Sequence, residues 1–211
     1  MYLDPDQRVR LAAIGWRGDD APQADPAATL ARVIAQHRNG YVAHDGENEF
    51  PVQPAPRFLR RDVGPEDRPA VGDFVWLKPG KPPLIDAILP RRSTLVRGAA
   101  GESYRRQIIA TNIDFVLVLM GLDGDFNPRR LERYLLLIEG SGAQPVIVLT
   151  KADRHADVAV ALAEVATIVP PGTLLHAINA KDAAGVAPLH VYVGSGMSAV
   201  LVGSSGAGKS T

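Results

Sequence analysis

The last nine residues of the chain place the tightest constraint on its fold. They match the phosphate-binding pattern G-x-x-x-x-G-K-[ST], in which glycines let the backbone curl so that successive N–H groups point at one anion. An apolar run at 197–202 precedes them and predicts the buried strand that such a loop needs. The nucleotide contacts expected from this loop are Gly203, Ser204, Ser205, Gly206, Ala207, Gly208, Lys209, Ser210 and Thr211.

Two residues of this loop are the expected catalytic groups. Lys209 is expected to reach the β- and γ-phosphates of a nucleotide, and Ser210 to bind Mg²⁺. The helix that follows such a loop forms half of the anion site, and it would lie beyond Thr211. We therefore expect the chain to be part of a longer protein and to bind nucleotide weakly by itself. The loop alone leaves ATP and GTP equally open.

The sequence Thr150-Lys151-Ala152-Asp153 favours GTP over ATP. It matches the guanine-reading pattern N-K-x-D, with threonine in place of asparagine. Asp153 can accept hydrogen bonds from the N1–H and 2-amino groups of guanine, a donor pair that adenine lacks. The aliphatic part of Lys151 can lie across the base. The alternative is a polar loop in which Asp153 caps the next helix.

A third polar segment, Asn179-Ala180-Lys181, follows the next apolar run. In GTPases the corresponding loop usually has the sequence S-A-K, and one of its backbone N–H groups contacts guanine O6. Asn179 departs from the usual serine. An ordinary polar turn explains the tripeptide equally well when it is considered in isolation.

Apolar runs and amphipathic segments alternate in the second half of the chain. Asn127-Pro128 is typical of a helix start, and 158–168 predicts a second helix. Strands alternating with helices indicate a parallel sheet with helices on both faces. The runs that predict buried strands are 113–120, 145–150, 173–178 and 198–202.

Residues 29–97 predict a small all-β domain. Prolines divide this stretch into short pieces, Asn39-Gly40 is typical of a tight turn, and 70–77 is the clearest strand. These features favour an OB-fold barrel, a frame that often binds oligonucleotides. We expect an N-terminal extension at 1–28, in which Trp16 packs as a hydrophobic anchor, and a linker at 98–112.

The order of the motifs is unusual, because the two guanine-reading loops come before the phosphate loop. This order predicts a circularly permuted α/β GTPase domain over 113–211, incomplete at its C-terminus. Together with Arg91-Arg92-Ser93 and the segment 110–114, residues 29–211 resemble the RsgA/YjeQ family of ribosome small-subunit-dependent GTPases. The resemblance implies GTP and Mg²⁺ as ligands, the small ribosomal subunit and its rRNA as partners, and a role in late subunit maturation.

The same resemblance places further elements after Thr211. These are the switch loops, a D-x-P-G element and a Cys/His domain that binds zinc, so zinc is expected only there. Two other functions stay open. One is an ATPase or kinase of another phosphate-loop class, and the other is a non-catalytic RNA-binding module with a vestigial nucleotide site.

The distribution of charge along the chain favours a polyanionic partner. Residues 57–106 carry 11 Lys and Arg against 6 Asp and Glu, although the whole chain has no net charge. Asp123 and Asp125, with Gly124 between them, predict a turn rather than a catalytic pair. The arginines expected to contact rRNA phosphates are Arg57, Arg60, Arg61, Arg91, Arg92, Arg105 and Arg106.

The cysteine and histidine content excludes disulfides and Cys-ligated zinc sites within this sequence. The chain contains no cysteine, and its five histidines show no metal-ligand spacing. No apolar run reaches the roughly 18 residues that a membrane span needs. We therefore expect a cytoplasmic protein without a membrane partner. No feature sets the oligomeric state, and a monomer is the default expectation.

Overall fold

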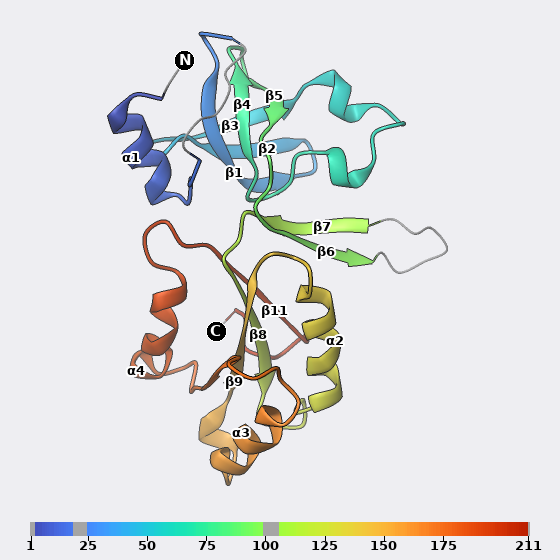
Figure 1. Cartoon of the computed structure of the whole chain (residues 1–211), viewed down its shortest axis with the longest axis vertical. Helices are drawn as coiled ribbons and strands as arrows, with labels where there is room; N and C mark the ends of the chain where they lie inside the picture. Colours follow the sequence, from blue (N-terminus) through green and yellow to red (C-terminus); the bar gives the residue numbers. More distant parts are fainter. Residues whose placement is uncertain (1–2, 19–24, 99–105, 211) are drawn as a thin grey trace. The chain divides into compact units, whose positions relative to one another are not determined.

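The structure is a computed structural model that describes residues 3–18, 25–98 and 106–210 (Figure 1). It divides into two compact units. The first comprises Met1–Ile113 with Ser195–Met197, and the second comprises Asp114–Gly194 with Ser198–Thr211. Each unit has its own hydrophobic core.

A closed five-stranded barrel forms the centre of the first unit. The strand order is β1-β2-β3-β5-β4, with β3 parallel to β5 and the other neighbours antiparallel. This arrangement confirms the expected OB-fold barrel. The elements are β1 (Thr29–His37), β2 (Gly40–His44), β3 (Glu49–Pro54), β4 (Phe74–Lys78) and β5 (Leu84–Ile88), with 3₁₀ turns η1 (Pro56–Leu59) and η2 (Pro65–Asp67).

Two glycines set the turns of the barrel. A tight turn is present close to the predicted position: Arg38 and Asn39 form it, and Gly40, with a φ of +148°, is the first residue of β2 and pairs with His37. A Cβ at Gly40 would lie 2.6 Å from Gln53 Nε2. Gly72 has a φ of +98°, and a Cβ there would lie 2.0 Å from the Thr111 carbonyl oxygen. The strand expected at 70–77 therefore begins only at Phe74. The core inside the barrel consists of Ala31, Val33, Ala43, Val52, Val75, Leu77 and Ile85.

The N-terminal segment packs on the outside of the barrel. Asp4 caps helix α1 (Pro5–Ala13), whose Leu11 is fully buried. Trp16 meets the Phe74 ring edge-on at a centroid distance of 4.9 Å, which confirms its role as a hydrophobic anchor. The extension at 1–28 is thus partly helical, and residues 19–24 of its expected loose part lie outside the described residues.

An antiparallel hairpin occupies much of the stretch expected to be a linker. It consists of β6 (Thr94–Gly98) and β7 (Arg106–Thr111). The linker expected at 98–112 is therefore wrong for the residues of β7, because inter-strand hydrogen bonds satisfy their backbone. Asn112 is buried and donates to the Gly72 carbonyl oxygen, so the first unit continues to Ile113. Arg105 of the predicted rRNA contacts lies outside the described residues.

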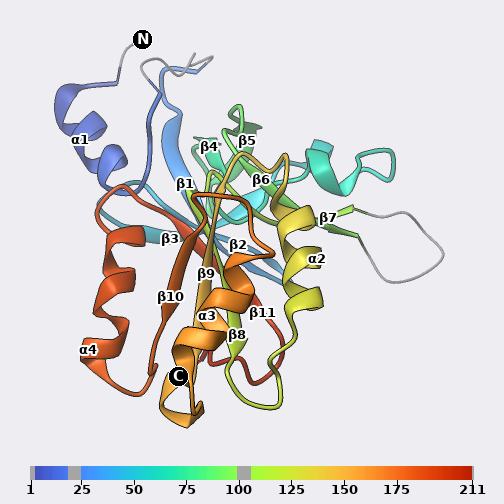
Figure 2. The same cartoon turned by 60° about the horizontal axis from the view of Figure 1, so that its bottom comes forward.

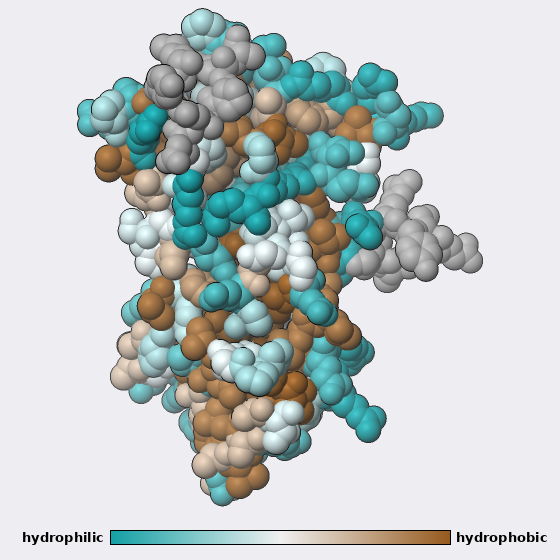
Figure 3. Space-filling view, in the orientation of Figure 1, coloured by the Kyte–Doolittle hydropathy of each residue, from teal (hydrophilic) through white to brown (hydrophobic). Residues whose placement is uncertain are grey.

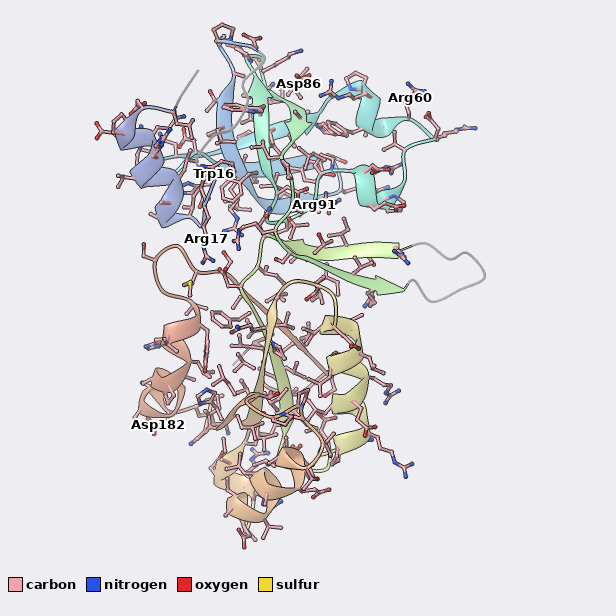
Figure 4. All side chains as sticks on the ribbon, viewed as in Figure 1. Trp16, Arg17, Arg60, Asp86, Arg91 and Asp182 are labelled. Atoms are coloured by element: carbon pink, nitrogen blue, oxygen red, sulfur yellow. The ribbon has the colours of Figure 1, made fainter. Side chains whose placement is uncertain are left out.

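A buried ion pair joins the barrel to this hairpin. Asp73 has no exposed surface and accepts hydrogen bonds of 2.7 Å from both Nε and Nη2 of Arg91. The same carboxylate accepts from Thr111 Oγ1 at 2.7 Å and from the Ala70 amide at 2.8 Å. Arg91, labelled in Figure 4, is thus an internal residue of the first unit. Its expected role as an rRNA contact is wrong, because its guanidinium is engaged by Asp73 and by the carbonyl oxygens of Glu66 and Arg68.

The second unit is built on a four-stranded parallel sheet with the order β10-β9-β8-β11. It confirms the predicted α/β domain, since each predicted apolar run supplies one strand. The strands are β8 (Phe115–Gly121), β9 (Gln144–Thr150), β10 (Leu174–Ala177) and β11 (Ala199–Gly203). The helical elements are α2 (Pro128–Ile138), η3 (Ala152–Arg154), α3 (Val158–Ala166), α4 (Ala183–Val186) and η4 (Ala187–Tyr192).

Helices cover both faces of this sheet. One face buries Leu117 and Val146 against Tyr192 of η4. Figures 1 and 2 show α4 and α2 on opposite sides of the sheet. The predicted start of α2 is confirmed, because the Asn127 side chain accepts from the Arg130 amide and Pro128 is the first helical residue.

The surface of the second unit is partly apolar in the view of Figure 3, where hydrophobic residues gather over α3. Val160 of α3 is 61% exposed and Leu136 of α2 is 69% exposed.

Among the described residues, no helix is both long enough and apolar enough to pass through a bilayer.

We predict that Asp73→Ala destabilises the first unit by about 3–5 kcal/mol, because it leaves the largely buried Arg91 guanidinium without its carboxylate. Both tryptophans, Trp16 and Trp76, lie in this unit, so tryptophan fluorescence during urea unfolding measures its stability. Asp62→Ala is the control, because Asp62 pairs with Arg60 at 65% and 66% side-chain exposure. That loss should cost less than about 1 kcal/mol. Equal effects of the two substitutions would contradict the prediction.

Candidate nucleotide-binding site

The three sequence motifs lie around one pocket of about 420 Å³ in the second unit. They meet because each follows a strand of the parallel sheet, and parallel strands end at the same edge. Of the predicted residues, Ala152, Gly203, Ser204 and Ala207 do not line the pocket, and Thr211 lies outside the described residues. The lining consists of Thr150, Lys151, Asp153, Arg154, Asn179, Ala180, Lys181, Ser205, Gly206, Gly208, Lys209 and Ser210.

The phosphate loop follows β11 and takes its shape from three glycines with positive φ. These angles are +153° at Gly203, +81° at Gly206 and +90° at Gly208. At Gly203 there is also no space for a side chain, because a Cβ would lie 2.4 Å from the Leu119 carbonyl oxygen. The backbone is thus held in the curl that turns amides toward an anion.

Lys209 folds back over this loop. Its Nζ donates to the carbonyl oxygens of Gly203 at 2.9 Å and Ser204 at 2.5 Å. A positive charge therefore stands at the loop before any phosphate arrives, which suits a site for an anionic ligand.

The base-reading loop is tied to the phosphate loop through Thr150. This side chain is fully buried, and its Oγ1 donates to the Ala207 carbonyl oxygen at 2.8 Å. The backbone then turns sharply at Lys151, which has a left-handed φ of 59°. The Ala152 amide donates to the Ile178 carbonyl oxygen at 3.1 Å, so the loop is fixed to β10 as well. Thr150, which stands in place of the asparagine of the pattern, therefore joins the two loops.

Asp153 is available for a ligand. Its carboxylate is exposed in the pocket lining, and no side chain in the described ranges 3–18, 25–98 and 106–210 forms a hydrogen bond or ion pair with it. The alternative role, capping the next helix, belongs to another residue. Asp157 caps α3, because its side chain accepts from the Val160 amide at 3.1 Å.

The third motif forms a tight turn at the edge of the pocket. The Asn179 side chain accepts from the Lys181 amide at 3.1 Å, an arrangement typical of an Asx turn. Ala180 packs against the hydrophobic core of the sheet, while all three residues line the pocket. The polar turn and the ligand-facing position are therefore both present.

Sequence reasoning missed three residues of this region. Arg154 lines the pocket directly after Asp153. Asp123 accepts a 2.6 Å hydrogen bond from Lys151 Nζ, and this bond lowers the pKa of Asp123 below its usual value. Asp125 contacts Ser204 of the phosphate loop. The predicted turn at 123–125 is present, but its position after β8, at the same sheet edge, was the signal that it belongs to the site.

A magnesium ion fits the donor set near the phosphate loop. Mg²⁺ keeps several waters and takes few protein ligands besides phosphate oxygens, so the exposed Ser210 hydroxyl in the lining suffices. Within the described residues there is no group of three or more His, Cys, Asp or Glu side chains that would hold a metal by themselves.

Comparison with protein families and curated proteins gives one consistent result. A model of the family RsgA GTPase matches residues 88–211. "Small ribosomal subunit biogenesis GTPase RsgA" of Xanthomonas oryzae pv. oryzae (strain MAFF 311018) is 49% identical over 219 residues, covering 99% of this chain and 59% of the relative. The protein of that name from Xanthomonas campestris pv. campestris (strain B100) is 49% identical over 211 residues, covering 95% of this chain and 57% of the relative. The chain thus spans about three fifths of their length.

Two solved structures share the fold. YjeQ from Thermotoga maritima superposes with a TM-score of 0.67 at 20% identity, covering 87% of this chain and 63% of that chain. YloQ, described as a circularly permuted GTPase, gives a TM-score of 0.62 at 19% identity, covering 90% of this chain and 64% of that chain.

We predict that Thr150→Val frees the phosphate loop, because valine has nearly the same shape but cannot donate to the Ala207 carbonyl oxygen. Leaving that acceptor unpaired costs about 1–3 kcal/mol. Hydrogen exchange followed by mass spectrometry should show faster exchange in the peptide 200–210. Thr150→Ser keeps the hydroxyl and should exchange like the parent chain. Equal exchange in all three proteins would show that this hydrogen bond does not hold the loop.

Proposed function

The chain belongs to the RsgA GTPase family, and we propose that it binds and hydrolyses GTP as a factor for late maturation of the small ribosomal subunit. The observation that supports this most is the convergence of a guanine-reading carboxylate and a phosphate loop on one pocket. Neither motif specifies GTP alone, and their meeting at one sheet edge supports GTP as the ligand.

Guanine recognition is assigned to the loops after β9 and β10. The free carboxylate of Asp153 would accept from N1–H and the 2-amino group of the base. The aliphatic part of Lys151 would lie against the ring. In the turn after β10, the backbone at Ala180 would approach guanine O6. A carboxylate held at this position faces no donor pair on adenine, which is the reason to prefer GTP over an ATPase or kinase function.

Phosphate binding and hydrolysis are assigned to the phosphate loop. Its amides and Lys209 would neutralise the charge that develops on the phosphate oxygens as water attacks. Ser210 would hold Mg²⁺, which supplies further charge neutralisation between the β- and γ-phosphates when it is bound. No described residue is assigned to the orientation of the attacking water.

The partner is proposed from the name that the relatives carry, small ribosomal subunit biogenesis GTPase. The exposed arginines of the first unit suit contacts with rRNA phosphates. Arg60 pairs with Asp62, and both side chains are about two thirds exposed at 66% and 65%. Arg57 is 52% exposed, and Arg61 and Arg106 also lie at the surface. Such a factor would act in the cytoplasm as a monomer.

We predict that Asp153→Asn lowers GTP affinity about a hundredfold, because it removes the charged acceptor of two hydrogen bonds. The same variant should gain affinity for xanthosine triphosphate, whose 2-oxo group accepts from the asparagine amide. Isothermal titration calorimetry with GTP, ATP and xanthosine triphosphate measures both changes. Asp182→Asn is the control, since Asp182 only caps α4 and asparagine caps equally well. Equal affinity of the parent chain for ATP and GTP would contradict the GTP assignment.

We predict that purified small ribosomal subunits stimulate GTP hydrolysis and that Lys209→Ala reduces the stimulated rate about a hundredfold or more. Phosphate release, measured with and without subunits, checks both statements. Co-sedimentation of the Lys209→Ala variant with subunits shows that binding is intact. Binding to subunits without stimulated hydrolysis by the intact protein would favour the non-catalytic RNA-binding module.

A further inference from the structure

The loop between β8 and α2 contacts both loops of the nucleotide site. Its two carboxylates, Asp123 and Asp125, are here called the acidic bracket. We propose that the acidic bracket positions the base-reading loop and the phosphate loop for guanine nucleotide before the nucleotide binds. This inference rests on the proposed GTP site, and it assigns a role to residues outside the pocket lining.

The sheet order explains why this loop reaches both sides. β8 lies between β9, which leads to Thr150 and Lys151, and β11, which leads to the phosphate loop. The segment after β8 is therefore the only strand-to-helix connection of the described sheet that stands between these two loops. One side chain of this segment can therefore contact the base-reading loop, and another can contact the phosphate loop.

Asp125 holds the phosphate-loop side. Its Oδ2 accepts a hydrogen bond from Ser204 Oγ, and its Oδ1 accepts one from Nη1 of Arg130 in α2. Burial opposes the charge of this carboxyl, but the hydrogen bonds from Ser204 and Arg130 outweigh it and lower the pKa of Asp125. The carboxylate is thus ionised at neutral pH and accepts from both donors.

Ser204 connects this contact to Lys209. The Ser204 carbonyl oxygen accepts from Lys209 Nζ at 2.5 Å, while the Ser204 hydroxyl is held by Asp125. A continuous chain of polar contacts therefore runs from Arg130 in α2 to the ammonium group proposed to bind the phosphates. A fixed Ser204 therefore holds the Lys209 ammonium group in one position before the nucleotide binds.

Asp123 holds the base-reading side. It accepts a hydrogen bond from Lys151 Nζ at 2.6 Å, and Lys151 itself lines the pocket, so the contact fixes one end of a lining side chain. Gly121 provides the space for this pair, because a Cβ there would lie 2.7 Å from Asp123 Oδ1 and 3.3 Å from Lys151 Nζ. The surface on which the base would lie is thus set without the base.

Preorganisation of this kind raises ligand affinity because the loops lose less conformational entropy on binding. A merely structural role would lower the stability of the unit and leave the nucleotide affinity of the folded protein unchanged. The two roles are therefore separated by measuring affinity and stability on the same variants.

The test is a double-mutant cycle in the intact protein, which is the parent for every variant. GDP and Mg²⁺–GTP affinities are measured by calorimetry for the parent, Asp125→Ala, Ser204→Ala and the double variant, with urea unfolding followed by circular dichroism. Each single substitution should weaken both affinities about tenfold, and the double variant should be no weaker than either, because they break the same contact. Asp125→Asn keeps one acceptor oxygen for Ser204 and should recover part of the affinity.

Matched variants on α2 and on Asp123 complete the experiment. Arg130→Ala should weaken GDP binding several-fold, whereas Arg129→Ala, one position earlier on the same helix, should not. Asp123→Asn should lower the affinity for guanine nucleotides, because it weakens the contact with Lys151. Its effect should add to that of Ser204→Ala, since the two substitutions break different contacts. Two outcomes would overturn the acidic bracket if the parent binds guanine nucleotide. One is unchanged affinity in both Asp125→Ala and Ser204→Ala, and the other is additive losses in the double variant. Absence of guanine nucleotide binding in the parent would instead refute the proposed function.

Discussion

The nucleotide site depends on one buried hydrogen bond, from Thr150 Oγ1 to the Ala207 carbonyl oxygen. Its partners follow β9 and β11, which are not neighbours in the sheet because β8 lies between them. A contact across the end of β8 is therefore needed to close the base-reading loop onto the phosphate loop. The acidic bracket after β8 contacts the same two loops at Lys151 and Ser204.

Chain order has little influence on this geometry. A pocket at the carboxyl ends of parallel strands needs the right strands side by side, whichever of them comes first in the sequence. Here the two loops proposed to read guanine precede the phosphate loop by more than twenty residues, yet all three line one pocket. A circular permutation can thus keep the order of strands in space, and YloQ, described as a circularly permuted GTPase, shares the fold.

The first unit is held by a different kind of contact. Asp73 and Arg91 form an ion pair in which every acceptor position of the carboxylate is used, and Thr111 brings the hairpin of β6 and β7 to it. This arrangement explains why an arginine in the most basic part of the chain is not available to a polyanion. A count of charges gives the sign of a surface but not which side chains form it.

The sequence by itself determined the four strands of the second unit and their order along the chain, because apolar runs, prolines and glycines act locally on the backbone. It also determined the phosphate loop and Asp153, since each motif is contiguous. Only the tertiary structure decided the pairing of β6 with β7, the ion pair of Arg91 with Asp73 and the positions of Asp123, Asp125 and Arg154. Each of these depends on partners far away in the chain, such as Asp125 with Ser204, and no local pattern specifies which strands become neighbours.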